Sequence, residues 1–167
     1  MSETLTPEIK YLFSLRDELA RATANEFMPI SERAALRRRR ERGYDILILG
    51  MAPHDFDKSE YLFSVSFGRS FDVVDDVHAR MQVDGTIAQI QQFAELLLGL
   101  PGVPEDAPAA WIETLSAHPR TLAAEMLETL ALVGEPFFAR YTDAKSARDA
   151  LVAEDPWCIG GSVKWAN

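Results

Sequence analysis

The residues best suited to binding chemistry in this chain are six arginines that lie close together in one short segment. They lie between residues 31 and 42, where two glutamates accompany them, so the segment has a charge of +4 in a chain whose net charge is −9. The rest of the chain holds 11 basic and 24 acidic residues, a balance of −13. Guanidinium groups bind phosphates and carboxylates through paired hydrogen bonds. The segment therefore either binds an anionic partner or pairs with the protein's own acids.

We expect the arginines to lie on a helix that Ser31 caps and Gly43 ends. Consecutive helical residues point in directions about 100° apart, so the run from Arg37 to Arg40 cannot present one surface. Arg33, Arg37 and Arg40 share a face in such a helix and are the candidate partner-binding or anion-binding residues. The abundance of acids elsewhere favours internal pairing over a binding patch.

Two acidic groups are weaker candidates for a cation site or for acid–base chemistry. His54, Asp55 and Asp57 fall in one polar loop, but no spaced set of histidines or cysteines supplies further ligands. A polar hairpin loop is the favoured interpretation.

The second group is Asp72, Asp75 and Asp76. Asp72 and either Asp75 or Asp76 would share a helix face, but the spacing differs from that of a calcium loop. Acids in a first helical turn are favoured by the helix dipole without any metal. We expect neither a metal nor a cofactor.

Cys158, the only cysteine, lies between Trp157 and Ile159 with no neighbouring base. We expect a buried apolar role for it rather than nucleophilic catalysis, and the absence of any internal disulfide suits the cytoplasm. The sequence also lacks the glycine patterns of nucleotide-binding loops, a zinc-protease motif and a serine-hydrolase motif.

The elements that must position these residues begin with a predicted helix over 7–27, for which Thr6 is the cap. Strands are predicted over 44–50, where the run is apolar on both faces, and over 61–67, where apolar and serine residues alternate. The polar segment between them predicts an antiparallel hairpin.

The second half of the chain predicts three helices, over 86–99, after Asp106 and from Pro119. A strand over 136–141, a helix over 144–153 and a terminal hairpin around Gly160-Gly161 would follow. The predicted fold is α+β: one helix-rich domain over 1–167 with a small, mostly antiparallel sheet. Within that range, residues 1–6 are expected to form a flexible terminus.

Composition limits the classes of partner. The longest apolar run, from Ile46 to Ala52, is too short to cross a bilayer, and the N-terminus lacks a signal-peptide pattern. A net charge of −9 disfavours binding to nucleic acid or to an anionic membrane.

The favoured function is therefore non-enzymatic protein binding, in the manner of bacterial immunity proteins or antitoxins that inhibit a basic partner. That comparison is an analogy of physical character. Two alternatives stay open: a small enzyme using the His54, Asp55 and Asp57 loop, and a nucleic-acid binder using the Arg33–Arg42 segment. The sequence leaves the oligomeric state open.

Overall fold

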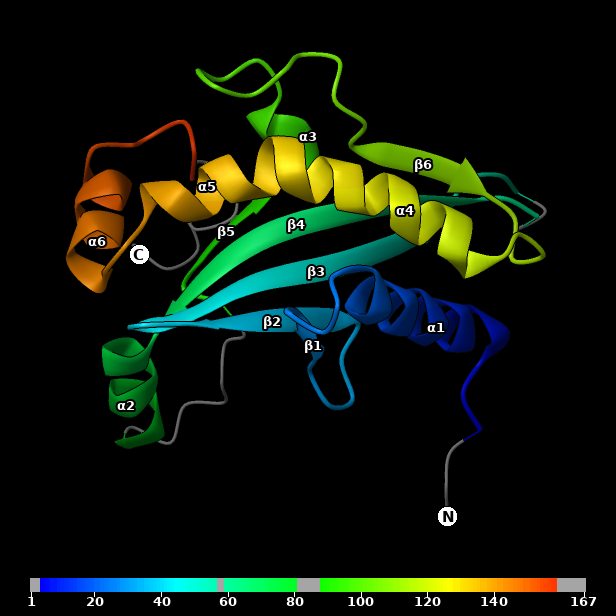
Figure 1. Cartoon of the computed structure of the whole chain (residues 1–167), viewed down its shortest axis with the longest axis horizontal. Helices are drawn as coiled ribbons and strands as arrows, with labels where there is room; N and C mark the ends of the chain where they lie inside the picture. The colour runs from blue at the N-terminus through cyan, green and yellow to red at the C-terminus, as the bar shows by residue number, and fades with distance from the viewer. Residues whose placement is uncertain (1–3, 57–58, 81–87, 159–167) are drawn as a thin grey trace.

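A computed structural model describes residues 4–56, 59–80 and 88–158 of the chain. Within these residues the fold is α+β, as predicted, with a six-stranded sheet whose strands all pair antiparallel (Figure 1). The strands are β1 (Met28–Pro29), β2 (Ala35–Arg40), β3 (Gly43–Pro53), β4 (Tyr61–Phe71), β5 (Ile90–Phe93) and β6 (Ala110–Glu113). The helices are α1 (Pro7–Ala22), α2 (Asp72–Arg80), α3 (Ala94–Leu97), α4 (Pro119–Thr129), α5 (Glu135–Arg140) and α6 (Ala144–Val152), with a π-helical turn (Leu130–Gly134) between α4 and α5.

The sheet is built around the long hairpin of β3 and β4, which pair along their whole length. Strands β2 and β1 extend it on the β3 side. On the β4 side two short strands share one edge: β6 pairs with Tyr61–Ser64 and β5 pairs with Ser66–Arg69. The predicted hairpin of two strands is therefore correct, and it forms the centre of a wider sheet.

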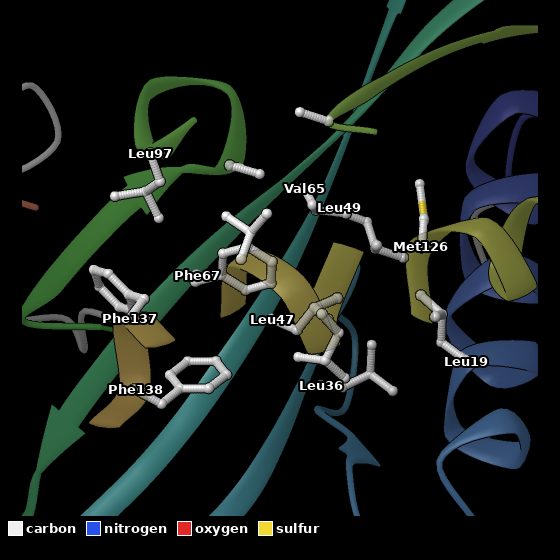
Figure 2. Close-up of a cluster of buried hydrophobic side chains, with 14 of the residues drawn as sticks. Leu19, Leu36, Leu47, Leu49, Val65, Phe67, Leu97, Met126, Phe137 and Phe138 are labelled. Carbon is white, nitrogen blue, oxygen red and sulfur yellow. The ribbon is translucent and has the colours of Figure 1, made fainter. Parts of the chain in front are cut away.

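Helices α1, α4 and α5 lie across one face of this sheet (Figure 1). The core between them is dominated by leucine and phenylalanine side chains from both layers, several of which Figure 2 shows converging. In β4 the alternation places Tyr61, Phe63, Val65 and Phe67 on the helix-covered face, as the sequence predicts. The opposite face carries the intervening serines and Leu62.

Local sequence accounts for the helix that precedes the sheet. The hydroxyl of Thr6 accepts a hydrogen bond from the Ile9 amide, and Pro7 occupies the first turn, where its missing N–H is harmless. The helix ends at Ala22, five residues earlier than predicted. Its buried stripe is Tyr11, Leu15, Leu19 and Ala20, whereas Ile9 is exposed.

The π-helical turn has an identifiable chemical origin. Pro136 has no N–H to donate to the carbonyl of residue 132, so the regular ladder cannot continue through it. The preceding residue, Glu135, donates instead to Leu130, five residues back. The chain thereby stays helical from Pro119 to Arg140.

Four predictions of secondary structure are wrong. The arginine segment is strand β2 rather than a helix, and Gly43 begins β3 rather than ending a helix. A helix predicted over 86–99 is replaced, where it is described, by β5 and the single turn α3.

The helix predicted after Asp106 is replaced by β6, and the strand predicted over 136–141 falls in helix α5. Helix α6 is confirmed, with Ala147 and Ala150 buried. The predicted hairpin around Gly160-Gly161 and residues 1–3 of the predicted flexible terminus lie outside the described residues.

Candidate functional site

The arginine-rich strand is organised by one buried carboxylate, Asp45, on the adjacent strand β3. Asp45 is fully buried and lies opposite Arg38 in the sheet. Its Oδ2 accepts hydrogen bonds from Nη2 and Nε of Arg38, at 2.7 and 3.0 Å, and its Oδ1 accepts one from Nη1 of Arg69, at 2.7 Å. Nε of Arg40 is 3.2 Å from the same Oδ2. Three guanidinium groups therefore surround a single carboxylate.

Arg38 is the most extensively bonded of these arginines. It also donates to Glu26 at 2.7 Å and to both oxygens of Glu135 at 2.9 Å. Its guanidinium carbon lies 4.6 Å from the ring centre of Phe27, a favourable cation–π distance. These contacts connect β2 with α5 and with the segment before β1, so Arg38 has a structural role.

Arg37 and Arg39 point to the opposite face of the sheet because side chains alternate along a strand. Both stack on Tyr44, at 4.3 and 4.9 Å from its ring centre. Arg39 also forms a paired interaction with the carboxylate of Asp72, at 2.7 and 2.8 Å.

The shared face predicted for Arg33, Arg37 and Arg40 does not exist, because it required a helix. Arg33 lies in the turn before β2, Arg37 on the face of the sheet opposite Asp45, and Arg40 on the Asp45 side. Four of the six arginines pair with acids of the chain: Arg38, Arg39, Arg40 and Arg42. Of the three candidate arginines, only Arg40 is among them. Among the described residues, Arg33 and Arg37 have no ion pair.

The loop of His54 and Asp55 is held by its own hydrogen bonds. Asp55 accepts from the amide and hydroxyl of Ser59 and from the amide of Glu60. The hydroxyl bond and these amides lower the pKa of Asp55. Asp57 lies outside the described residues. The carboxylate of Asp55 thus stabilises the turn between β3 and β4.

Asp72, Asp75 and Asp76 fall in helix α2, at or near its first turn. The carboxylates are engaged separately: Asp72 with Arg39, and Asp75 with the side-chain amide of Gln89 at 2.7 Å. Asp76 is exposed. In the described part of the chain no three histidine, cysteine or acidic side chains are placed to hold a metal ion.

Cys158 is buried, and its Sγ lies 3.4 Å from the carbonyl oxygen of Asp155. Burial raises the pKa of the thiol, an effect opposite to the one that activates a nucleophilic cysteine.

The face of the sheet opposite α1, α4 and α5, where α2 begins beside Arg39, exposes large apolar side chains. Leu62 of β4 has Ala52 and Ile112 as its direct neighbours on the two flanking strands, and Phe93 lies opposite Ser66. Leu62 is 38% exposed, while Ile112 and Phe93 are each 48% exposed. We call this surface the sheet patch; it consists of Ile48, Gly50, Ala52, Leu62, Ser64, Phe93, Ala110 and Ile112.

Sequence reasoning missed Asp45, Arg69 and the sheet patch as features of interest. Arg69 follows the predicted strand over 61–67, whereas a signal for Asp45 was present, because it is a charged residue inside an otherwise apolar strand. Such a residue must be paired if its strand is buried. The sheet patch could not be predicted, because two of its exposed residues, Phe93 and Ile112, lie on β5 and β6, and both segments were predicted to be helices.

No helix among the described residues has the length and apolar character needed to cross a membrane. Comparison of the chain with protein-family models, curated proteins and solved structures gives no match. Function must therefore be argued from the residues themselves.

Proposed function

We propose that this chain is a non-enzymatic protein-binding domain of the bacterial cytoplasm that holds a basic partner protein against its sheet patch. The observation that carries the proposal is the exposure of the neighbouring Leu62 and Ile112, and of Phe93, paired four residues further along β4, on a face that α1, α4 and α5 leave uncovered. Contiguous exposed apolar side chains on a protein surface mark interaction sites far more often than isolated ones do.

Charge supports a basic partner. Glu60 immediately precedes β4 and Glu95 follows Phe93 by two residues, and both side chains are exposed. These acids, which adjoin the patch in sequence, suit a partner with basic groups around an apolar centre, while the exposed Arg37 on the same face contributes one opposing charge. The net charge of −9 adds long-range attraction for such a partner.

The ion pairs of the arginines also support a protein partner over a nucleic acid. Arg38, Arg39 and Arg40 are bonded to the protein's own carboxylates, which leaves less of their charge for nucleic acid. A single buried cysteine is compatible with a reducing cytoplasm.

The test compares wild type with Leu62→Asp/Ile112→Asp in affinity capture from the lysate of the native cell. The matched control is Val73→Asp/Val152→Asp, which adds the same charge at exposed apolar positions on α2 and α6. We expect wild type and control to retain one basic protein at comparable stoichiometry and the patch variant to lose it. Thermal melts establish that all three chains are folded.

Two results would contradict the proposal. In the first, the patch variant captures the same proteins as wild type. In the second, the wild-type chain self-associates and only the patch variant is monomeric, so that the patch binds a second copy of this chain.

A further inference from the structure

A cavity of about 640 Å³ opens between the β2–β3 turn and the junction of α5 with α6. Its volume is within the range of small-ligand sites, roughly 300–1,000 Å³. Four arginines line it: Arg39, Arg40, Arg42 and Arg69. Arg39 is held by both oxygens of Asp72, which leaves the other three as the arginines available to a ligand. It lies apart from the sheet patch, because Arg40 and Arg69 belong to the Asp45 side of the sheet.

Arg69 is the unusual member of this group. It is only 3% exposed, yet its one hydrogen bond to a described residue is the 2.7 Å contact from Nη1 to Asp45. Its buried Nε has no partner among the described residues. Buried donors in native proteins are nearly always satisfied, so the unpartnered Nε marks Arg69, which lines the cavity, as a side chain whose hydrogen-bonding capacity is not fully used by Asp45.

Arg40 and Arg42 keep much of their donor capacity available. The side chain of Arg40 is 46% exposed, and its contact with Asp45 uses Nε. Arg42 is 64% exposed, and its nearest carboxylate, that of Asp143, is 4.0 Å away, beyond hydrogen-bonding distance. Thr142, also on the cavity wall, adds an exposed hydroxyl.

Acids limit how much negative charge the cavity can accept. Glu41 and Asp143 lie on its wall, and Asp45 lies behind it with two of the three arginines. A polyanion such as nucleic acid would also meet the repulsion of a chain with net charge −9. The ligand is therefore small and has one anionic group.

We propose that this cavity binds a small phosphorylated molecule whose phosphate group is held by Arg40, Arg42 and Arg69. A phosphate offers more acceptor oxygens than a carboxylate and can accept from three guanidinium groups at once. The remaining volume accommodates the organic part of the ligand.

The test is isothermal titration at constant ionic strength with phenyl phosphate, inorganic phosphate and acetate. The variant is Arg40→Gln/Arg42→Gln, and the matched control is Arg33→Gln/Arg37→Gln, which removes the same charge from the same segment outside the cavity. We expect saturable binding of phosphate compounds, weakened at least about tenfold in the variant and unchanged in the control. Arg42→Lys, which keeps the positive charge but removes the planar guanidinium group and its paired donors, should also weaken binding.

Arg42→Gln alone keeps the test decisive if the double variant unfolds, because the Arg42 side chain is mostly exposed. Equal affinity for both phosphate compounds identifies a free-phosphate site, and tighter binding of phenyl phosphate identifies an organic ligand. The proposal is overturned if no saturable binding occurs up to about 10 mM, if acetate binds as well, or if the matched control loses as much affinity. Phosphate binding should persist in Leu62→Asp/Ile112→Asp, so the two proposals fail separately.

Discussion

At the scale of single residues, Asp45 shows how one buried charge is compensated by several partners. Breaking a buried ion pair from one side leaves an uncompensated charge, which costs about 3–5 kcal/mol. Arg38 and Arg69 are both buried and both depend on Asp45 for a hydrogen bond. We therefore expect Asp45→Ala to lower the free energy of unfolding by about that amount.

Chemical denaturation of Asp45→Ala and of wild type measures this loss. The control is Asp76→Ala, an exposed acid on α2 whose removal should change stability by less than about 0.5 kcal/mol. Similar small effects at both positions would mean that the arginines around Asp45 are satisfied by water instead.

The ion pairs of the arginines show which part of this arrangement the sequence can predict. Internal pairing of the arginines is predictable from composition, because 24 acids lie outside the segment. Which acids they use is not predictable, since Glu135 and Arg38 are 97 residues apart in the chain. Asp72 was considered for a cation and instead binds Arg39, a pairing that required β2 to lie beside the start of α2.

At the scale of elements, alternation in β4 makes a sharp prediction. Phe63 is fully buried, whereas the adjacent Leu62 points to the face opposite α1, α4 and α5 and is partly exposed. We expect Phe63→Ala to lower the free energy of unfolding by about 3–5 kcal/mol, the usual range for truncation of a buried phenylalanine. Leu62→Ala should cost much less, because its side chain already contacts water. Equal losses in denaturant melts would contradict the orientation of this strand.

The π-helical turn supplies a second prediction about an element. An alanine in place of Gly134 would raise intrinsic helix propensity by about 1 kcal/mol. A Cβ at Gly134, however, would lie 2.7 Å from the ring of Phe67 and 3.0 Å from Leu130. Both neighbours are buried, so the steric clash should outweigh the gain in helix propensity. We expect Gly134→Ala to lower the free energy of unfolding by about 1–3 kcal/mol.

Thermal or chemical denaturation decides the sign of this change. A stabilised Gly134→Ala variant would show that α4–α5 is not packed this closely on β4.

Elements were predictable where local chemistry and packing agree. The cap at Thr6, the proline at the start of α4 and the alternation in β4 are local signals, and the structure follows them. Four arginines in a row favour a helix locally, but pairing with β3 and the contact with Asp45 make them a strand. Strands β5 and β6 depend on a distant partner, β4, which no local pattern reveals.

At the scale of the whole molecule, acid should reduce stability over a defined pH range. Hydrogen bonds from Ser59, Arg39 and Ser146 lower the pKa values of Asp55, Asp72 and Asp143 respectively. A carboxylate whose pKa is lower in the folded state stabilises the fold above its unfolded pKa, about 3.9, and loses this effect as pH falls through its folded pKa.

We therefore expect the urea midpoint to vary little between about pH 7 and pH 5 and to fall below about pH 4. Asp72→Asn should make the fall shallower. A midpoint that is constant down to about pH 2.5 would contradict this assignment. A single cooperative transition at each pH is also expected if the chain is one domain.

The central claim concerns the surface that the molecule offers to a partner. The most direct measurement is a titration of the purified captured partner with wild type, Leu62→Asp/Ile112→Asp and Val73→Asp/Val152→Asp, at low and high salt. We predict affinity at least about tenfold weaker for the patch variant at both salt concentrations, wild-type affinity for the control, and weaker binding of wild type at high salt. Wild-type affinity in the patch variant would contradict the claim.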